Sequence, residues 1–273
     1  MTARTGAGDR VGRILAAADG GAQIAPLTDD DPHYDVEQAY RTLAALHERR
    51  IAQGWRPAGR KIGFTNRTIW PRYGVYRPMW SHVWDRTVTH ATDGTAALDV
   101  SHLHEPRIEP EVVFGLAAPL PAEGDARAVL ESVAWIAAGF EIVHSIFPGW
   151  RFRAPDCTAA FGLHGLLAVG ERTPVGHENR DRLAELLPSC RVTLRNGDRV
   201  VDTGVGADVL DGPAHALAYL RDVLAAQPEF PALGAGELVT TGTITDAWPV
   251  ASGDRWASDY GELPVRGLTL AIL

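Results

Sequence analysis

The chain has 273 residues, of which 45% are hydrophobic and 22% are charged, a composition that fits a globular protein of one large or two small domains. Its formal net charge of -8, with no basic run, argues against a nucleic-acid-binding protein. Because the chain has neither an N-terminal apolar signal region nor a run of roughly 18 uninterrupted apolar residues, we expect a cytoplasmic protein without a membrane partner that binds a small molecule.

The first third of the chain favours helices. Residues 9–18 predict a first helix, before the turn-prone residues 29–32. Over residues 36–52, apolar side chains recur at roughly helical spacing between charged ones, which indicates an amphipathic helix. Glycine and proline then interrupt the chain before the short segment Lys61-Ile62-Gly63-Phe64. We therefore expect a mainly helical N-terminal region over residues 1–85 that contributes this lysine segment.

After about residue 86, short runs rich in Val, Ile, Leu and Thr alternate with glycine and proline clusters, which is typical of a β-rich protein. Strands are predicted at residues 112–116, 140–143, 166–169, 191–195, 238–241 and 268–272. Helices are expected at residues 126–138 and 213–226. Asn196-Gly197 indicates a hairpin turn, because this pair tolerates the positive φ of tight primed turns. The predicted fold class is therefore α+β.

Two residue types are rare enough to be informative. Lys61 is the only lysine among the 26 basic residues. Since a lysine can lose its proton where a guanidinium stays charged, this position is either an accident of composition or one that requires a compact, deprotonatable amine. The two cysteines, Cys157 and Cys190, cannot form a disulfide framework, and no Cys/His cluster suggests zinc. We expect both to be reduced, partly buried thiols.

Three glutamates lie in or beside apolar strands. Extended geometry places Glu109 and Glu111 on the same face of one strand. They are either exposed at the strand entrance or buried, and buried carboxylates repel each other unless a proton or a cation lies between them. Glu141 lies in the apolar run Phe140-Glu141-Ile142-Val143, directly after the expected helix, where an unpaired carboxylate is costly to bury. The three could converge on Mg²⁺, Mn²⁺ or Ca²⁺, which prefer oxygen ligands.

A threonine-rich segment follows the predicted strand at residues 238–241. The turn Thr240-Thr241-Gly242-Thr243 offers hydroxyl groups and backbone N–H groups that can bind an anion. The alternative is a turn that hydrogen-bonds only its own backbone, which is common for threonine. The residues alone leave both interpretations open.

Four motifs occur in a recognisable order and approximate spacing: Gly59-Arg60-Lys61-Ile62-Gly63, Ile108-Glu109-Pro110-Glu111, Phe140-Glu141-Ile142-Val143 and Leu238-Val239-Thr240-Thr241-Gly242-Thr243. Together they resemble the fumarylacetoacetate hydrolase superfamily, and within it the branch of 2-keto-4-pentenoate hydratases and oxalocrotonate-type decarboxylases. The resemblance runs from about residue 59 to residue 273. It implies a mixed β-roll with flanking helices and a small helical N-terminal part, a catalytic core over residues 86–273, and a homo-oligomer.

The resemblance also implies an active site. Three residues fall on the ligand positions of a Mg²⁺ or Mn²⁺ ion: Glu109, Glu111 and Glu141. Lys61 falls on the active-site lysine of the family. Three residues are expected to bind substrate: Gly63, Thr241 and Thr243. His164 is a candidate general acid or base, and a histidine of the core or pocket wall that is bonded to the backbone explains it equally well.

The chain departs from the family pattern in three places. Better-known hydratases usually carry an acidic residue after the proline that corresponds to Pro78, whereas this chain has Met79. Their counterpart of residues 160–164 tends to read Asp-Asn followed by small residues and serines. His144 stands where an aspartate is frequent. These departures concern the substrate and the proton-transfer group, because the three metal-ligand positions are complete.

Three functions follow from these residues. A metal chelated by the carboxylate and the 2-oxo group of a substrate stabilises an enolate, which serves tautomerisation, hydration, decarboxylation and C–C cleavage alike. Because the resemblance is nearest to the hydratase branch, hydration of a 2-hydroxy-2,4-dienoate to a 4-hydroxy-2-oxo acid is expected first. Decarboxylation of a 2-oxo-3-enedioate, or another C–C cleavage or tautomerisation of an oxo acid within the superfamily, is the second. A non-catalytic protein that binds metal and oxo acid is the third, because Met79 replaces an acidic residue.

The sequence leaves two alternatives for the chemical nature of the substrate's tail. A second carboxylate on the substrate would require an additional cation, for which there are five candidates: Arg67, Arg72, Arg77, Arg151 and Arg153. The aromatic-rich residues 70–84 could instead form an apolar pocket for a longer tail, or pack in the core or between subunits.

Overall fold

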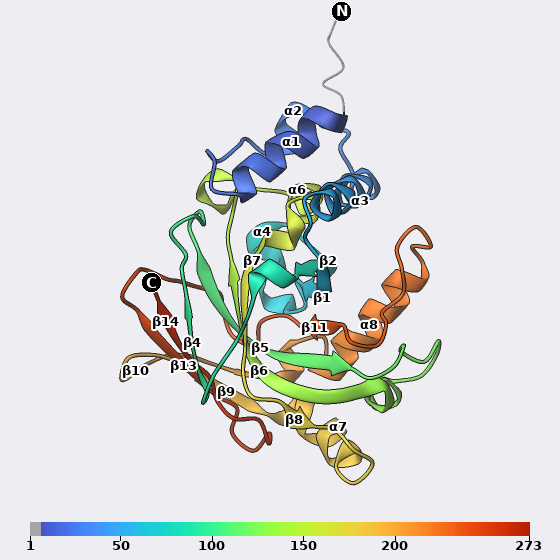
Figure 1. Cartoon of the computed structure of the whole chain (residues 1–273), viewed down its shortest axis with the longest axis vertical. Coiled ribbons are helices and arrows are strands. Elements are labelled where there is room, and N and C mark those ends of the chain that lie inside the picture. The colour runs from blue at the N-terminus through green and yellow to red at the C-terminus, as the bar shows by residue number, and fades with distance from the viewer. Residues whose placement is uncertain (1–6) are drawn as a thin grey trace, which may run out of the picture.

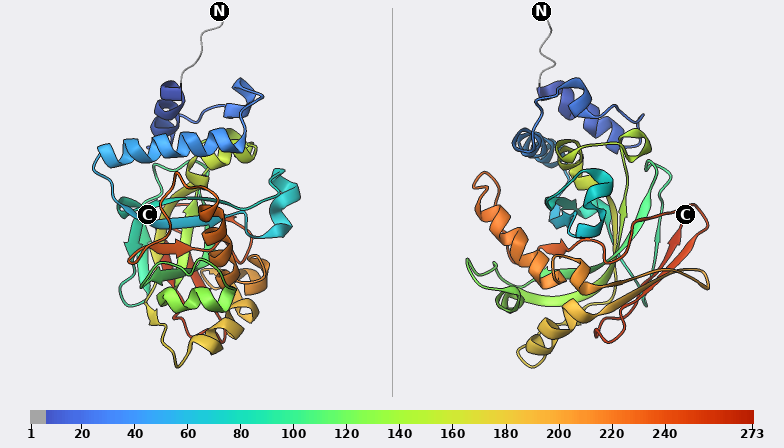
Figure 2. Two further views of the ribbon diagram at one scale, coloured as in Figure 1. Left: turned by 90° about the vertical axis from the view of Figure 1, so that its right-hand side faces the viewer. Right: turned by 180° about the vertical axis from the view of Figure 1, so that it is seen from behind.

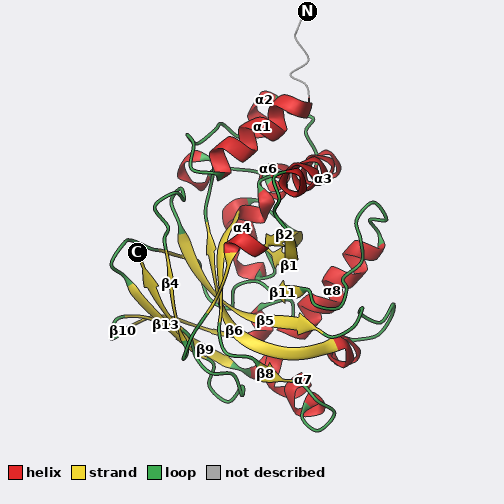
Figure 3. Cartoon of the chain, viewed as in Figure 1, coloured by secondary structure: helices red, strands yellow, loops and turns green. Residues whose placement is uncertain are grey.

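A computed structural model describes residues 7–273 (Figure 1), so the first six residues of the expected N-terminal region lie outside the described part. The helices are α1 (Ala7–Ala18), α2 (Leu27–Asp30), α3 (Val36–Ala52), α4 (Trp70–Tyr73), α5 (Ala126–Val129), α6 (Ala154–Ala159), α7 (Arg180–Ser189) and α8 (Pro213–Ala225). The strands are β1 (Pro57–Gly63), β2 (Met79–Trp84), β3 (Val88–His90), β4 (Thr95–Leu98), β5 (Arg107–Leu116), β6 (Val133–Val143), β7 (His164–Val169), β8 (Thr173–Pro174), β9 (Arg191–Asn196), β10 (Arg199–Val205), β11 (Leu238–Thr240), β12 (Trp248–Pro249), β13 (Arg255–Asp259) and β14 (Thr269–Ile272). This mixture of curled sheets and helices confirms the predicted α+β class (Figure 3).

The larger sheet carries the strands of all four motifs. Its order is β2-β1-β11-β5-β6-β7-β3, with β12 paired to β5 and β8 to β6. Strands β5 and β6 are antiparallel and almost entirely buried, which makes them the centre of the sheet. Strand β1 joins the sheet by parallel pairing with β11, which in turn pairs with β5. This order brings Lys61 on β1 within two strands of the glutamates on β5.

The smaller sheet has the order β10-β9-β13-β14-β4. Figures 1 and 2 show it beside the curved larger sheet, away from helices α1 to α3. The β9–β10 hairpin confirms the predicted turn: Asn196 pairs with Arg199, and Gly197 between them has a φ of 57°. Its backbone thus uses the conformational freedom of glycine.

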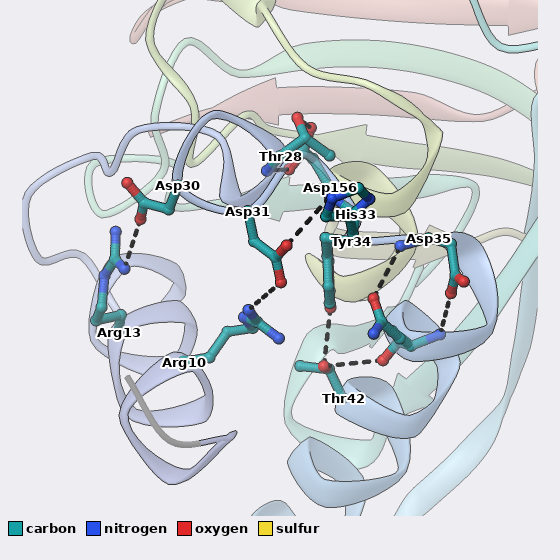
Figure 4. Close-up of polar contacts among 11 residues, drawn as sticks. Arg10, Arg13, Thr28, Asp30, Asp31, His33, Tyr34, Asp35, Thr42 and Asp156 are labelled. Carbon is teal, nitrogen blue, oxygen red and sulfur yellow. Dashed lines mark hydrogen bonds and ion pairs between the residues drawn. The ribbon is translucent and has the colours of Figure 1, made fainter. Parts of the chain in front are cut away.

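Polar contacts fix the N-terminal helices: a buried one joins α2 to α6, and an exposed one joins α1 to α2. The carboxylate of Asp156 on α6 accepts hydrogen bonds from the backbone N–H and the hydroxyl of Thr28 on α2, at 2.9 and 2.7 Å (Figure 4). Helix α1 is joined to α2 by an ion pair of 2.9 Å between Arg13 and Asp30. Asp156 is fully buried, and with a third hydrogen bond, from the backbone N–H of Arg153, its carboxylate is satisfied where it would otherwise be costly to bury.

The expected helix over residues 126–138 is wrong beyond its first turn. Helix α5 ends at Val129, and residues 133–138 form the first half of β6. These residues, Val-Ala-Trp-Ile-Ala-Ala, are mostly buried on both faces of the strand. Their side chains therefore show no alternation that would separate a buried strand from a helix. Glu141 lies in the second half of this long strand and does not follow a helix.

The remaining helices and the cysteines agree with the sequence. Helices α1, α3 and α8 occupy the predicted positions, and Cys157 and Cys190 are free and buried. Among residues 7–273, no helix combines the length and the apolar character that crossing a bilayer requires. Strands β1 and β2 belong to the larger sheet, and the division of the chain at residue 85 stays a prediction.

Candidate metal centre and active-site cavity

Three glutamates meet on neighbouring strands. Glu109 on β5 and Glu141 on β6 are direct partners across the β5–β6 pair, and Glu111 lies two residues further along β5. One carboxylate oxygen of each lies within 4.8 Å of the others. Like charges directly opposite each other destabilise a sheet, so this arrangement requires positive charge or protons between the carboxylates.

Lys61 supplies one of the missing positive charges. Its Nζ lies 3.1 Å from Oε2 of Glu141 and donates a hydrogen bond of 2.9 Å to the carbonyl oxygen of Gly162. Burial alone would lower the pKa of Lys61, but the three nearby carboxylates outweigh it and raise this pKa above its ordinary value. The amine therefore stays protonated against three acidic groups.

Glu141 is held from two sides. Its Oε2 faces Lys61, and its Oε1 lies 2.7 Å from Nδ1 of His164. Although burial acts to raise the pKa of Glu141, Lys61 and His164 lower it to about 2. The other ring nitrogen of His164 lies 2.8 Å from the hydroxyl of Thr87. Both nitrogens of this buried ring are thus engaged with side chains, and neither with the backbone.

The negative charges of the other two glutamates are not fully compensated by neighbouring side chains. Glu111 accepts a hydrogen bond of 2.8 Å from the N–H of Gly242 through Oε2, while its buried Oε1 has no hydrogen-bond partner among the described residues. Burial and the neighbouring carboxylates raise the pKa of Glu111 well above its usual range. Burial, helped by Glu141 and opposed by Lys61, raises the pKa of Glu109 to about 7. A hard divalent cation fits this oxygen-only donor set and would allow all three groups to be ionised.

A cavity opens beside the cluster. Its inner end is lined by Lys61, Glu109 and Gly162, and by two of the residues predicted to bind substrate, Gly63 and Thr243. A methyl group on Gly63 would lie 3.1 Å from Nζ of Lys61, so glycine keeps the approach to the amine open. The inner end thus combines one ammonium group with a carboxylate cluster.

Thr241 lies outside this lining. It is fully buried, and its hydroxyl donates a hydrogen bond of 3.0 Å to the carbonyl oxygen of Val112. In the same turn, the N–H of Gly242 is used by the carboxylate of Glu111. Gly242 has a φ of 95°, and a Cβ there would lie 1.8 Å from the hydroxyl of Thr65. The turn therefore positions a glutamate, a role that neither interpretation of the sequence, an anion-binding loop or a turn bonded to its own backbone, had included.

The departures from the family pattern lie in different surroundings. Met79 is buried, with its sulfur 2.7 Å from the sulfur of Cys157, and is not part of the cavity lining. His144 is also buried, and burial with nearby histidines lowers its pKa to about 3. Gly162 and Leu163 do line the cavity. Met79 thus contacts a buried thiol and takes no part in the cavity.

The outer wall of the cavity was largely missed from the sequence. It is formed by four aromatic side chains: Phe64, Tyr73, Trp150 and Phe152. Only Tyr73 belongs to the aromatic segment 70–84, whose Trp80 and Trp84 are buried away from the cavity. The available signal was the aromatic run at residues 147–152 and the aromatic residue directly after the glycine that ends β1. Nothing in the sequence around Thr87 indicated that it would contact His164.

Comparison with known proteins gives the chain its relatives. No protein-family model matches it. It is 30% identical to a 2-keto-4-pentenoate hydratase of Paraburkholderia xenovorans (strain LB400) over 242 residues, which is 88% of this chain and 86% of the relative. It is 29% identical to a 2-hydroxyhexa-2,4-dienoate hydratase of Comamonas testosteroni over 245 residues, 89% of each chain.

Solved structures agree with these relatives. The 4-oxalocrotonate decarboxylase from Pseudomonas putida G7, complexed with magnesium and adipate, superposes with a TM-score of 0.87 over 100% of this chain and 99% of that chain, at 25% identity. Fumarylpyruvate hydrolase from Pseudomonas aeruginosa, in complex with Mn²⁺ and pyruvate, shares the fold with a TM-score of 0.59 at 15% identity, over 80% and 89% of the two chains. The predicted fumarylacetoacetate hydrolase type of fold is confirmed, and the chain belongs to the 2-keto-4-pentenoate hydratase family.

Proposed function

We propose that this protein is a divalent-metal-dependent hydratase that converts a 2-hydroxy-2,4-dienoate into a 4-hydroxy-2-oxo acid. The observation that carries the proposal is the cluster of three carboxylates beside Lys61 at the inner end of the cavity. The names of the hydratase relatives support the reaction. The magnesium in the decarboxylase structure and the oxygen-only donors support Mg²⁺ or Mn²⁺, and a homo-oligomer stays a prediction.

Each residue of the inner end has a role in this proposal. Glu109, Glu111 and Glu141 would hold the metal ion, which would supply Lewis-acid stabilisation of negative charge on the C2 oxygen of the substrate. Hydration requires a proton at C5, loss of the proton on the C2 hydroxyl, and addition of water with OH at C4 and H at C3. The protonated amine of Lys61 lines the cavity, so it can deliver a proton to the substrate or hold its carboxylate.

His164 is proposed as a positioning residue. Its ring lies behind Glu141 and bridges this carboxylate to the hydroxyl of Thr87. Such hydrogen bonds orient metal ligands and tune their affinity. Thr243 and Gly63 line the cavity next to Lys61 and would contact the substrate.

The test follows the ultraviolet absorbance of 2-hydroxypenta-2,4-dienoate with the purified protein and Mg²⁺, with EDTA as control and NMR identification of the product. The expected result is metal-dependent formation of 4-hydroxy-2-oxopentanoate. Glu109→Gln, which changes a cavity-lining carboxylate, should abolish it, whereas Glu131→Gln, at an exposed glutamate, should not. Turnover that survives both EDTA and Glu109→Gln would contradict the proposal.

Decarboxylation is the second candidate. It is favoured by the full-length structural match to 4-oxalocrotonate decarboxylase. Release of CO₂ from a 2-oxo-3-enedioate, faster than hydration of any dienoate under the same conditions, would select it. Metal binding with turnover of neither substrate would instead select the non-catalytic binding protein.

A further inference from the structure

The outer half of the cavity is an aromatic wall, formed by Phe64, Tyr73, Trp150 and Phe152. Tyr73 stacks on Phe152 with a centroid distance of 5.5 Å and an angle of 3°. Phe64 meets Tyr73 and Phe152 edge-on, at 5.8 and 6.3 Å. Rings in mutual contact at these distances support one another, so the wall is preformed.

The polar ends of the wall are occupied by the protein itself. The hydroxyl of Tyr73 accepts a hydrogen bond of 3.0 Å from Arg107, whose guanidinium also lies 4.1 Å from the ring centre of Trp150. The indole N–H of Trp150 donates to the carbonyl oxygen of Glu105 at 3.1 Å. What the wall offers to a ligand is therefore mainly ring carbon.

Two wall residues hold an unfavourable backbone conformation. Phe64 has a φ of 55° and Trp150 a φ of 57°, in the left-handed region that residues other than glycine rarely adopt. Such conformations persist only where the surroundings fix them, and they are concentrated at binding and catalytic sites. The two rings are thus placed in the cavity at a cost in backbone conformational energy.

Positive charge for a second carboxylate is scarce along this cavity. Of the five arginines considered as partners of such a group, only Arg72 lines the cavity. Arg72 is 3.6 Å from Asp246 and more than half exposed, so its charge is already shared between an acidic partner and water. A carboxylate at the end of the substrate's tail would have to compete with both, or lose its hydration against aromatic rings.

We propose that the aromatic wall selects 2-hydroxy-2,4-dienoates whose tail beyond C5 is a bulky apolar chain or ring, over substrates with no tail or with a carboxylate at its end. This inference rests on the proposed function, because the dienoate head must lie at the inner end beside Lys61. The same cavity is lined by Lys61 and Glu109 and by the four aromatic side chains, so a tail that extends beyond C5 would meet the aromatic wall.

The first experiment compares kcat/KM for four substrates: 2-hydroxypenta-2,4-dienoate, 2-hydroxynona-2,4-dienoate, 2-hydroxy-7-phenylhepta-2,4-dienoate and 2-hydroxyhexa-2,4-dienedioate. A single methylene group in a hydrophobic pocket changes kcat/KM by about 10-fold or more, so the butyl and phenylethyl tails should exceed the unsubstituted dienoate by at least that factor. The dienedioate should be the poorest of the longer substrates. A flat series, or a preference for the dienedioate, would overturn the inference.

Variants of the wall residues test whether the aromatic wall causes the preference for apolar tails. Phe152→Ala and Tyr73→Leu should each bring the kcat/KM ratio of the nonadienoate to the pentadienoate close to one, whereas Tyr76→Ala, at an aromatic residue that is 66% exposed, should keep the wild-type ratio. Two wall variants are used because one of them could fold poorly. A ratio unchanged in both folded wall variants would overturn the inference.

A binding measurement separates this inference from the proposed function. Calorimetry with Mg²⁺ compares the unreactive acids 2-oxopentanoate and 2-oxononanoate. If 2-oxononanoate binds about 10-fold more tightly than 2-oxopentanoate, or more, and Phe152→Ala loses this preference, the aromatic wall is supported. This holds even if no dienoate is turned over, because absence of turnover would overturn the hydratase proposal alone. Equal or weaker binding of the longer acid would overturn the inference even in an active hydratase.

Discussion

Two adjacent cations of β1 face opposite sides of the larger sheet and meet different surroundings. Arg60 makes an ion pair of 2.7 Å with Glu237, and its guanidinium lies 5.5 Å from the ring centre of Trp80. Lys61 faces the carboxylates of Glu109, Glu111 and Glu141. One side of the strand is balanced in charge, and the other has an excess of acid.

The difference separates a structural ion pair from a binding site. Arg60 and Glu237 neutralise each other, so no further charge is needed on that side. On the other side, one ammonium group cannot neutralise three clustered carboxylates, two of them fully buried, an arrangement that stability alone does not favour. Clusters of strongly perturbed acids beside a cavity are typical of functional sites.

Replacing Lys61 should have the largest effect. Lys61→Met removes the proton-transferring amine, and we expect kcat to fall by about 10²- to 10⁴-fold. Lys61→Arg should not restore it, because a guanidinium is larger and does not release its proton. Steady-state kinetics on the pentadienoate measure both. Glu237→Gln, on the opposite side of β1, is the control: it should lower the free energy of unfolding and leave kcat unchanged. Full activity of Lys61→Arg would contradict this assignment.

His164 should matter through Glu141. In His164→Gln the bridge to Thr87 is weakened, and we expect a loss of about 10- to 100-fold in metal affinity or in activity. Thr87→Val removes the outer hydrogen bond of His164, together with the bonds of this hydroxyl to the backbone of Trp84, and should cost less Mn²⁺ affinity than His164→Gln. Mn²⁺ affinity is the decisive measurement, since a merely structural histidine would leave it unchanged in the folded protein. An unchanged Mn²⁺ affinity together with a large loss of kcat would point to direct proton transfer.

Gly242 tests how closely the threonine turn is packed against the carboxylate cluster. A Cβ at this position would clash with Thr65 at 1.8 Å, whereas Gly253, with a similar φ of 92°, has no atom within 4 Å. Gly253→Ala therefore measures the backbone cost alone. We expect Gly242→Ala to lower the free energy of unfolding by about 1–3 kcal/mol more than Gly253→Ala does. It should also weaken Mn²⁺ binding, because Gly242 positions Glu111. Equal urea-unfolding free energies for the two variants would argue against this packing.

The smallest expected effect is a pH dependence on the Arg60 side of β1. Burial, with help from Arg60 and His47, lowers the pKa of His82 to about 2. Below the unfolded pKa of about 6.5, the unfolded chain binds a proton that the native His82 does not, so stability is lost as the pH falls. His82→Asn should reduce this loss by up to about 1.4 kcal/mol per pH unit between pH 6 and pH 5. Urea unfolding at several pH values measures it, and parallel curves would contradict the assignment.

Local patterns explain what could be predicted from the sequence. Helix α3 was predicted because its apolar side chains recur at helical spacing, and the structure adds a cap by Asp35 at its N-terminus. Glu109 and Glu111 were placed on one face because alternation along a strand is a local property. Residues 133–138 were mistaken for a helix because a strand buried on both faces has no alternation.

Contacts between distant segments could not be predicted in the same way. The aromatic wall takes Phe64 from the end of β1, Tyr73 from α4, and Trp150 and Phe152 from the segment before α6. No regular spacing of residues along the sequence predicts that these rings are in contact. The hydrogen bond between His164 and Thr87 joins residues that are 77 positions apart and is equally invisible in the sequence.

The central claim is that the carboxylate cluster binds one divalent metal ion. Mn²⁺ binding to the metal-free protein, followed by electron paramagnetic resonance and calorimetry, tests it most directly. We expect one Mn²⁺ per chain in the wild type and in Glu131→Gln, and strongly weakened binding in Glu111→Gln, which removes the charge of a fully buried ligand while preserving its shape. The same stoichiometry and affinity in a folded Glu111→Gln variant, or no binding by the wild type, would contradict the account.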